Sequence, residues 1–160
     1  MKKRIHKLFI FSVLFFALSA ENSYKRVKPK FKKEPFKNGV AYYYYGWQKQ
    51  GIGYIDKSLI SKNLDWVSDY KVYITKAYGA GESFPHQIVN KPMLGKPNSC
   101  CTETYLLIGP FSSKSRAENV ISYIETRLFR FLVLLIKNTQ NAMKKVYSFV
   151  PIQNFDESWT

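Results

Sequence analysis

The chain has 160 residues, a length that excludes an array of several domains and fits one domain, or one domain with a processed end. A hydrophobic content of 46% is ordinary for a globular protein that buries a core. The net charge of +14 favours a polyanionic partner, either nucleic acid or an anionic membrane surface.

Residues 1–20 have the pattern of a secretory signal peptide. Four Lys/Arg within residues 1–7 precede an apolar stretch over residues 8–18, and small residues at 17–20 predict cleavage after Ala20. The apolar stretch is shorter than the ~20 residues that a membrane-spanning helix needs. The alternative is an amphipathic segment that begins here through an accident of gene boundaries.

Residues 21–38 form a basic, proline-containing arm without apolar periodicity, which predicts a flexible, solvated linker able to track phosphates. The charge is concentrated at this end of the chain. Residues 1–37 hold 11 Lys/Arg against 2 acidic residues (+9), whereas residues 38–160 hold 14 against 9 (+5). The domain expected over residues 39–160 is therefore only mildly basic.

Aromatic residues dominate the start of that domain. Residues 39–54 are bounded by glycines and predict two short strands about a turn at 48–51. Strand alternation would place two of the four tyrosines at 42–45 on each face, which favours a half-buried strand over a base-stacking platform. Residues 56–63 predict a capped helical turn, and residues 71–76 alternate like a strand.

The middle of the chain carries no catalytic or metal-binding motif. The glycines at 79 and 81 lack the spacing of a nucleotide cradle, so a plain turn and a loop that touches DNA both fit. Residues 84–99 hold three prolines and predict an irregular connection. The only cysteines, Cys100 and Cys101, are adjacent, which disfavours a disulfide, and they have no partners at zinc-ligand spacing. We expect no metal and two semi-buried thiols in a reducing compartment.

The apolar run at residues 105–108, stopped by Gly109-Pro110, predicts a strand. Serines at 112, 113 and 115 offer helix caps, and steps of three and four predict an apolar stripe on one long helix. That stripe is formed by Ala117, Val120, Ile121, Ile124, Leu128, Phe131, Leu132 and Leu135. Residues 146–150 predict a last strand. The fold class expected is α+β: a small mixed sheet with one long amphipathic helix of roughly 20 residues packed on it.

Many blocks of this sequence, in order over residues 36–160, resemble the C-terminal part of bacterial restriction–modification adenine-specific DNA methyltransferases. The blocks are GYIDK (53–57), YKVYI (70–74), KAYGAG (76–81), PNSCCTETY (97–105), IGPF (108–111), AENVISY (117–123), FRFLV (129–133), KNTQ (137–140) and YSFVP (147–151). The resemblance implies target recognition and contacts with double-stranded DNA in the cytoplasm. The family continues beyond Thr160, so we expect the domain to be truncated at its C-terminus.

In that family the N-terminal part binds S-adenosylmethionine and carries an Asn-Pro-Pro-Tyr/Phe motif. This chain has no Asn-Pro-Pro triplet. The resemblance therefore implies no cofactor in this chain, no activity of the chain alone, and a catalytic partner polypeptide that supplies methyl transfer.

Candidate DNA contacts lie at loop ends and beyond the helix, where lysine reaches phosphates and polar side chains read base edges. They are Lys76, Tyr78, Asn98, Ser99, Thr102, Thr104, Lys137, Asn138, Gln140, Lys144 and Lys145. Each also fits a solvated or capping residue. Two other readings of the whole chain stay open: a non-functional remnant of a split methylase gene, and a small secreted basic protein.

Overall fold

The computed structural model describes residues 31–77, 88–137 and 144–157. The signal-like residues 1–20 and the first part of the arm lie outside the described residues. The elements in chain order are β1 (Gly39–Tyr43), α1 (Trp47–Gln50), β2 (Gly53–Asp56), η1 (Lys57–Leu59), η2 (Leu64–Ser68), β3 (Tyr70–Thr75), β4 (Met93–Gly95), β5 (Ser99–Cys101), β6 (Tyr105–Phe111), α2 (Lys114–Glu125), α3 (Arg127–Ile136) and η3 (Lys144–Tyr147).

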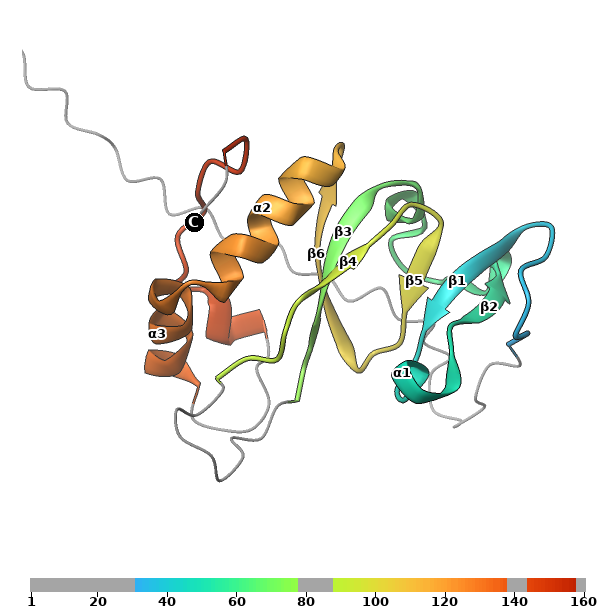
Figure 1. The fold of residues 1–160 in the computed structure, drawn as a ribbon, viewed down its shortest axis with the longest axis horizontal. Coiled ribbons are helices and arrows are strands. Elements are labelled where there is room, and N and C mark those ends of the chain that lie inside the picture. The colour runs from blue at the N-terminus through green and yellow to red at the C-terminus, as the bar shows by residue number, and fades with distance from the viewer. Residues whose placement is uncertain (1–30, 78–87, 138–143, 158–160) are drawn as a thin grey trace, which may run out of the picture.

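The strands form two three-stranded sheets (Figure 1). In the outer sheet, β1 lies between β2, which is antiparallel to it, and β5, which is parallel to it. In the central sheet, β3 lies between β4 and β6, and both pairs are antiparallel. The predicted α+β class is confirmed, with the strands divided between two small sheets.

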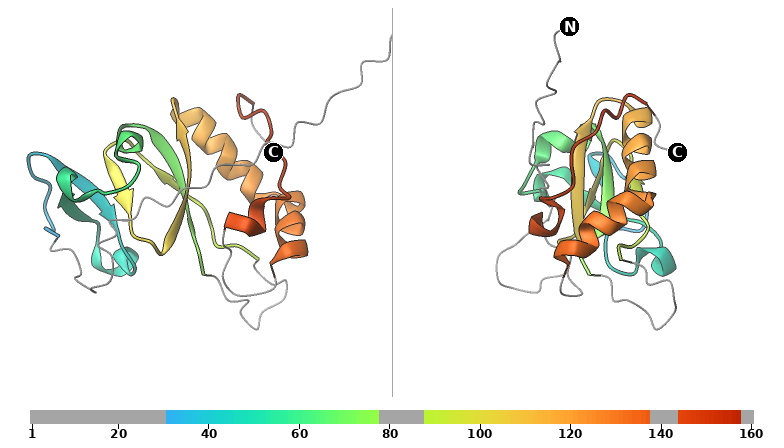
Figure 2. Two further views of the ribbon diagram at one scale, coloured as in Figure 1. Left: turned by 180° about the vertical axis from the view of Figure 1, so that it is seen from behind. Right: turned by 90° about the vertical axis from the view of Figure 1, so that its left-hand side faces the viewer.

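Strands β3 and β6 lie between two hydrophobic cores. Val72, Ile74 and Leu106 face α2, α3 and the C-terminal segment, whereas Tyr73 and Leu107 face the outer sheet. Figures 1 and 2 show the same three layers, with the helices on one side of the central sheet and the outer sheet on the other. A strand buried on both faces needs a continuous apolar run, which explains the sequence of residues 105–108.

The predicted long helix is divided in two at Thr126. This residue has an extended backbone, and its Oγ1 donates to the Tyr123 carbonyl (2.7 Å) and accepts from the Phe129 amide (3.2 Å). One threonine thus ends α2 and caps α3, as short polar side chains do at helix ends. Helix α2 itself begins after Ser113, whose hydroxyl accepts from the Arg116 amide.

The break changes which residues of α3 face the core. The predicted stripe holds in α2, where Ala117, Val120 and Ile124 are buried. In α3 the buried residues are Phe129 and Val133, and the stripe residues Leu128, Phe131 and Leu135 are exposed.

Residues 146–150, predicted to be a strand, instead continue a 3-10 helix into a turn. Val146, Tyr147 and Val150 enter the helical core, and the Tyr123 hydroxyl donates to the Pro151 carbonyl. The prediction of a strand is wrong because these apolar residues are buried against helices.

The described end of the arm belongs to the folded unit. The Phe31 ring stacks on Tyr44 with centroids 4.6 Å apart, and Lys32 forms an isolated antiparallel bridge with Tyr54. Tyr42 and Tyr44 are buried on this side of β1, and Tyr43 lies on the other side against Tyr73. The predicted alternation is thereby confirmed for Tyr42, Tyr43 and Tyr44, whereas Tyr45 lies beyond the strand and is exposed.

Lys71 is fully buried where the central sheet meets η2. Its ammonium donates to the carbonyls of Trp66 (2.9 Å), Val67 (3.0 Å) and Asp69 (2.9 Å). Gly95, opposite Lys71 in β4, is required here because a Cβ would lie 2.7 Å from Lys71 Cγ. Lys71 therefore ties the end of η2 to the central sheet.

Substituting Lys71 by Met removes three donors from buried or half-buried carbonyls. We expect the free energy of unfolding to fall by about 1–3 kcal/mol in urea denaturation. The matched control is Lys96→Met at an exposed lysine, which should change stability by less than ~0.5 kcal/mol. Equal stability of wild type and Lys71→Met would contradict the role assigned to the ammonium.

The same pair tests the ionisation of Lys71. Burial lowers the pKa of this ammonium from 10.5 to about 8. Between these pH values the unfolded chain holds a proton that the folded protein has released, so stability rises with pH. We expect the stability of wild type relative to Lys71→Met to increase from about pH 8 to pH 10.5.

Cys100 and Cys101 form no disulfide with each other, and both thiols are buried more deeply than the sequence predicts. Burial raises the pKa of Cys100 to about 12 and that of Cys101 well above its usual range. Because the thiolate is the reactive form, both should react with a thiol reagent at neutral pH only as fast as the protein unfolds. Rapid labelling of the native protein would contradict this placement.

Candidate nucleic-acid interface

One edge of the molecule gathers three of the predicted DNA contacts. Lys76 follows the end of β3, and Thr102 and Thr104 lie in the turn between β5 and β6. The Lys76 amide donates to the Thr104 carbonyl (2.9 Å), and the hydroxyls of Thr102 and Thr104 are hydrogen-bonded to each other (2.5 Å). The ends of β3 and β5 and the start of β6 therefore place these side chains together.

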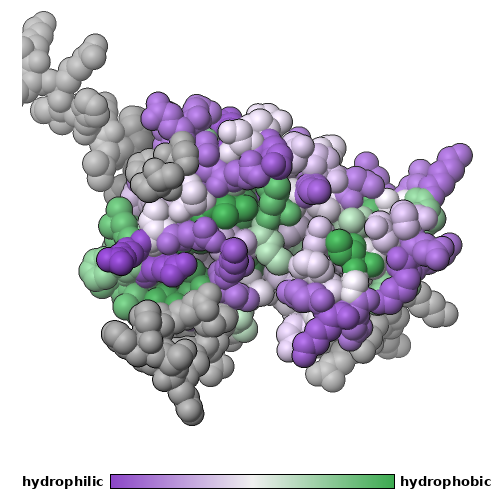
Figure 3. Space-filling view, viewed as in Figure 1, coloured by the Kyte–Doolittle hydropathy of each residue, from purple (hydrophilic) through white to green (hydrophobic). Residues whose placement is uncertain are grey.

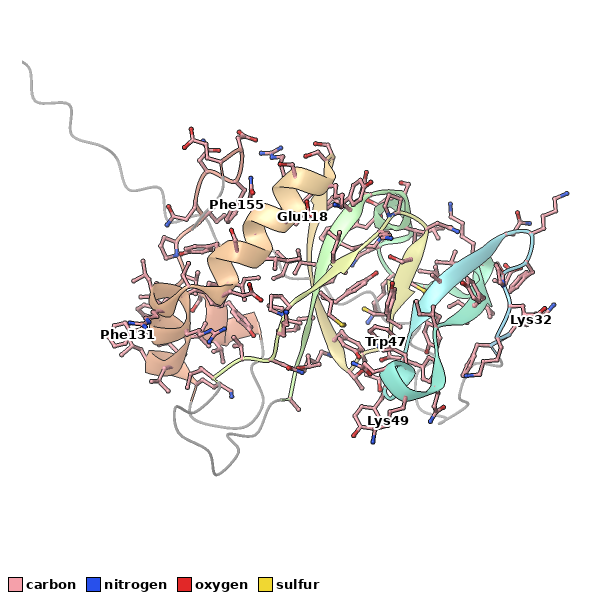
Figure 4. The ribbon with its side chains drawn as sticks, viewed as in Figure 1. Lys32, Trp47, Lys49, Glu118, Phe131 and Phe155 are labelled. Carbon is pink, nitrogen blue, oxygen red and sulfur yellow. The ribbon has the colours of Figure 1, made fainter. Side chains whose placement is uncertain are left out.

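Helix α1 extends the same edge with residues that the sequence did not single out. The Trp47 indole donates to the Tyr105 hydroxyl at the start of β6 (3.1 Å), which holds α1 beside the β5–β6 turn. Gln48 and Lys49 of this helix are exposed, and Figure 4 shows Lys49 pointing outward below Trp47. We call Gln48, Lys49, Lys76, Thr102 and Thr104 the strand-end cluster. The only sequence signal for α1 was a polar turn at 48–51.

A shallow hollow adjoins this cluster on the outer sheet. Its lining includes Lys33, Trp47, Gln50 and Tyr54. The Lys33 ammonium donates to the Gln50 carbonyl (2.7 Å) and the Tyr44 hydroxyl (3.0 Å), which fixes a positive charge at its rim. Tyr45, just before α1, is 84% exposed and presents an unpacked aromatic ring.

Asn98 and Ser99 lie at the opposite end of β5 and have structural roles. Asn98 has a left-handed backbone (φ 58°), and its side-chain amide donates to the Gly39 carbonyl (3.0 Å). Ser99 is buried, with its hydroxyl bonded to the Lys96 carbonyl and the Tyr73 hydroxyl. The structure therefore separates both residues from Thr102 and Thr104.

Lys137 ends α3, and its ammonium donates to the Ile88 carbonyl (2.8 Å). Partial burial lowers the pKa of this group. This bond fixes the entrance to β4 against α3, so the side chain is turned toward the protein. Of the other predicted contacts, Tyr78, Asn138 and Gln140 lie outside the described residues, and so do the side chains of Lys144 and Lys145.

The strand-end cluster offers hydrogen-bond donors of the kinds that bind polyanions. The cluster contains two ammonium groups, one amide and two hydroxyls, and the exposed Glu103 lies between the two threonines in the chain. Within the described residues, no group of three or more His, Cys, Asp and Glu could hold a metal ion. No helix among residues 31–77, 88–137 and 144–157 is long and apolar enough to cross a membrane.

Comparison of the chain with family models, with curated proteins and with solved structures gives no match.

Asn98 provides a test of the division between structural and interface residues. Asn98→Ala should lower the free energy of unfolding by about 1–2 kcal/mol, because alanine disfavours this backbone and the bond to Gly39 is lost. Asn98→Gly keeps the backbone conformation and should lose less. If the candidate interface binds DNA, both variants should bind it like wild type. Weaker binding at unchanged stability would show that Asn98 contacts DNA after all.

Proposed function

We propose that this chain is a target-recognition fragment of a restriction–modification adenine-specific DNA methyltransferase, and that it binds double-stranded DNA through the strand-end cluster. The observation that supports the proposal is the convergence of Lys49 and Lys76 with Gln48, Thr102 and Thr104 on one edge. Ammonium groups neutralise phosphates, whereas amides and hydroxyls can reach base edges.

The two kinds of side chain divide the work of recognition in this proposal. Lys49 and Lys76 contact the phosphate backbone and supply affinity that does not depend on sequence. Discrimination between base pairs comes from Gln48, Thr102 and Thr104. A glutamine amide can form two hydrogen bonds with adenine, and a threonine hydroxyl can donate a hydrogen bond to a base edge or accept one from it. Tyr45, which is exposed two residues before α1, adds an aromatic surface.

The proposal assigns no cofactor to this chain. S-adenosylmethionine and the methyl-transfer step belong to a catalytic partner polypeptide, since the Asn-Pro-Pro triplet is missing here. Adenine methylation of cellular DNA further places the chain in the cytoplasm. The buried thiols of Cys100 and Cys101 agree with a reducing compartment.

The test is a salt titration of duplex-DNA binding by the whole chain, with a panel of random and defined sequences. Lys49→Ala and Lys76→Ala should each weaken binding equally for all sequences and lower the salt slope by about 1. Lys96→Ala, at an exposed lysine before the opposite end of β5, is the matched control and should bind like wild type.

Thr102→Val and Thr104→Val keep the shape of the side chain and remove the hydroxyl. We expect them to reduce the difference in affinity between preferred and random sequences and to leave the salt slope unchanged. Salt-insensitive binding would contradict the phosphate-contact proposal. Equal loss in Lys96→Ala and Lys49→Ala would show that the strand-end cluster has no special role.

A further inference from the structure

Helix α3 turns an apolar face to solvent at the end of the molecule opposite the outer sheet. Leu128, Phe131, Leu134 and Leu135 are 50–60% exposed although all are large and apolar. Helical geometry places them on one side, away from the buried Phe129 and Val133. Figure 4 shows Phe131 pointing away from the body, and Figure 3 shows hydrophobic surface at this end.

The size of this face is that of a contact surface. Four large side chains, each about half exposed, make an apolar patch of a few hundred Å², the range that marks interaction sites on soluble proteins. We call Leu128, Phe131, Leu134 and Leu135, with Arg127 beside them, the α3 face.

The two charged residues within α3, Arg127 and Arg130, are both basic. Arg127 is exposed, and no described carboxylate pairs with it or with Arg130. The Nε atom of Arg130 is buried and has no hydrogen-bond partner among the described residues. An occupant must therefore be apolar in its centre and acidic at its rim.

These features argue against a second copy of the chain as the molecule that covers the α3 face. Two α3 faces brought together would place the Arg127 and Arg130 side chains of both copies around one small interface. A helix of 10 residues is also too short to bury the roughly 800 Å² per partner of a stable dimer, an area that weaker binding of a single helix does not need.

The arginines of α3 also favour a polypeptide over an anionic bilayer as the partner of the α3 face. Arg130 is partly buried beside the apolar side chains, with its Nε out of contact with solvent. A basic residue that binds a bilayer extends its long apolar stem so that the charged group reaches the lipid headgroups. A half-buried guanidinium is better matched by carboxylates held in fixed positions on a folded partner, where paired hydrogen bonds have a defined geometry.

We propose that the α3 face docks an acidic amphipathic helix of a different polypeptide. Leucine-like side chains of that helix pack between Leu128, Phe131 and Leu135, and its flanking carboxylates pair with Arg127 and Arg130. The role of this partner, methyl transfer, rests on the proposed function. The chemistry of the partner's surface rests on α3 alone.

The test uses two dye-labelled synthetic helical peptides of equal length, with leucines at helical spacing and either Glu or Lys at the flanking positions. Fluorescence anisotropy with the whole chain should show about tenfold tighter binding of the Glu peptide. Phe131→Ser combined with Leu135→Ser should abolish binding. The matched control combines Leu59→Ser and Leu64→Ser, two leucines exposed elsewhere, and should bind like wild type.

The charge-reversal variant Arg127→Glu gives the sharpest readout, because it should shift the preference from the Glu peptide toward the Lys peptide. Equal binding of both peptides, or binding unaffected by the Phe131 and Leu135 substitutions, would overturn the proposal. Binding to phosphatidylglycerol vesicles without binding to either peptide would identify a bilayer instead. Self-association that depends on Phe131 would identify a second copy.

DNA binding measured on the same variants separates this inference from the proposed function. The α3 variants should bind duplex DNA like wild type. If the chain binds the Glu peptide but no DNA, the docking surface is supported and the proposed role in target recognition is contradicted.

Discussion

The fold depends on burying both faces of β3 and β6 at once. Successive residues of these strands face opposite ways, so Val72 and Ile74 enter the helical core while Tyr73 enters the core beneath the outer sheet. The placement of Lys71 follows from the same constraint, because its ammonium is satisfied only where η2 ends against β3.

Much of this architecture could be predicted from local sequence. The apolar run at 105–108 and the tyrosines at 42–44 encode burial through a short-range pattern, and both form as expected. The strand predicted at 71–76 forms as β3, but its four central residues are all buried, so the predicted alternation of buried and exposed residues is wrong. The division of the helix could not be predicted in this way. The apolar spacing continues across Thr126, and the break there depends on the double cap by Thr126 together with the burial of Phe129 and Val133. The last segment likewise pairs with helices, which no local pattern indicates.

The candidate site was partly predictable for the same reason. Lys76, Thr102 and Thr104 follow or precede strands, and strand ends meet at a sheet edge, so their convergence was implied by the fold. Asn98 and Ser99 belong to the same stretch of sequence, but three residues of extended strand carry them to the other edge. Gln48 and Lys49 were missed because α1 is a single turn, held in place by the distant bond between Trp47 and Tyr105.

The break at Thr126 links the architecture to the second surface. A continuous helix would have directed Leu128, Phe131 and Leu135 inward as an extension of the α2 stripe. Because a new helix begins at Arg127, Phe129 and Val133 point inward instead, and the residues that would have continued the α2 stripe are exposed to solvent. The α3 face and the strand-end cluster then have no residue in common, because the first lies on α3 and the second lies on α1 and at the ends of β3, β5 and β6 (Figure 1). The DNA and the acidic partner helix that we propose would therefore contact different side chains of the chain.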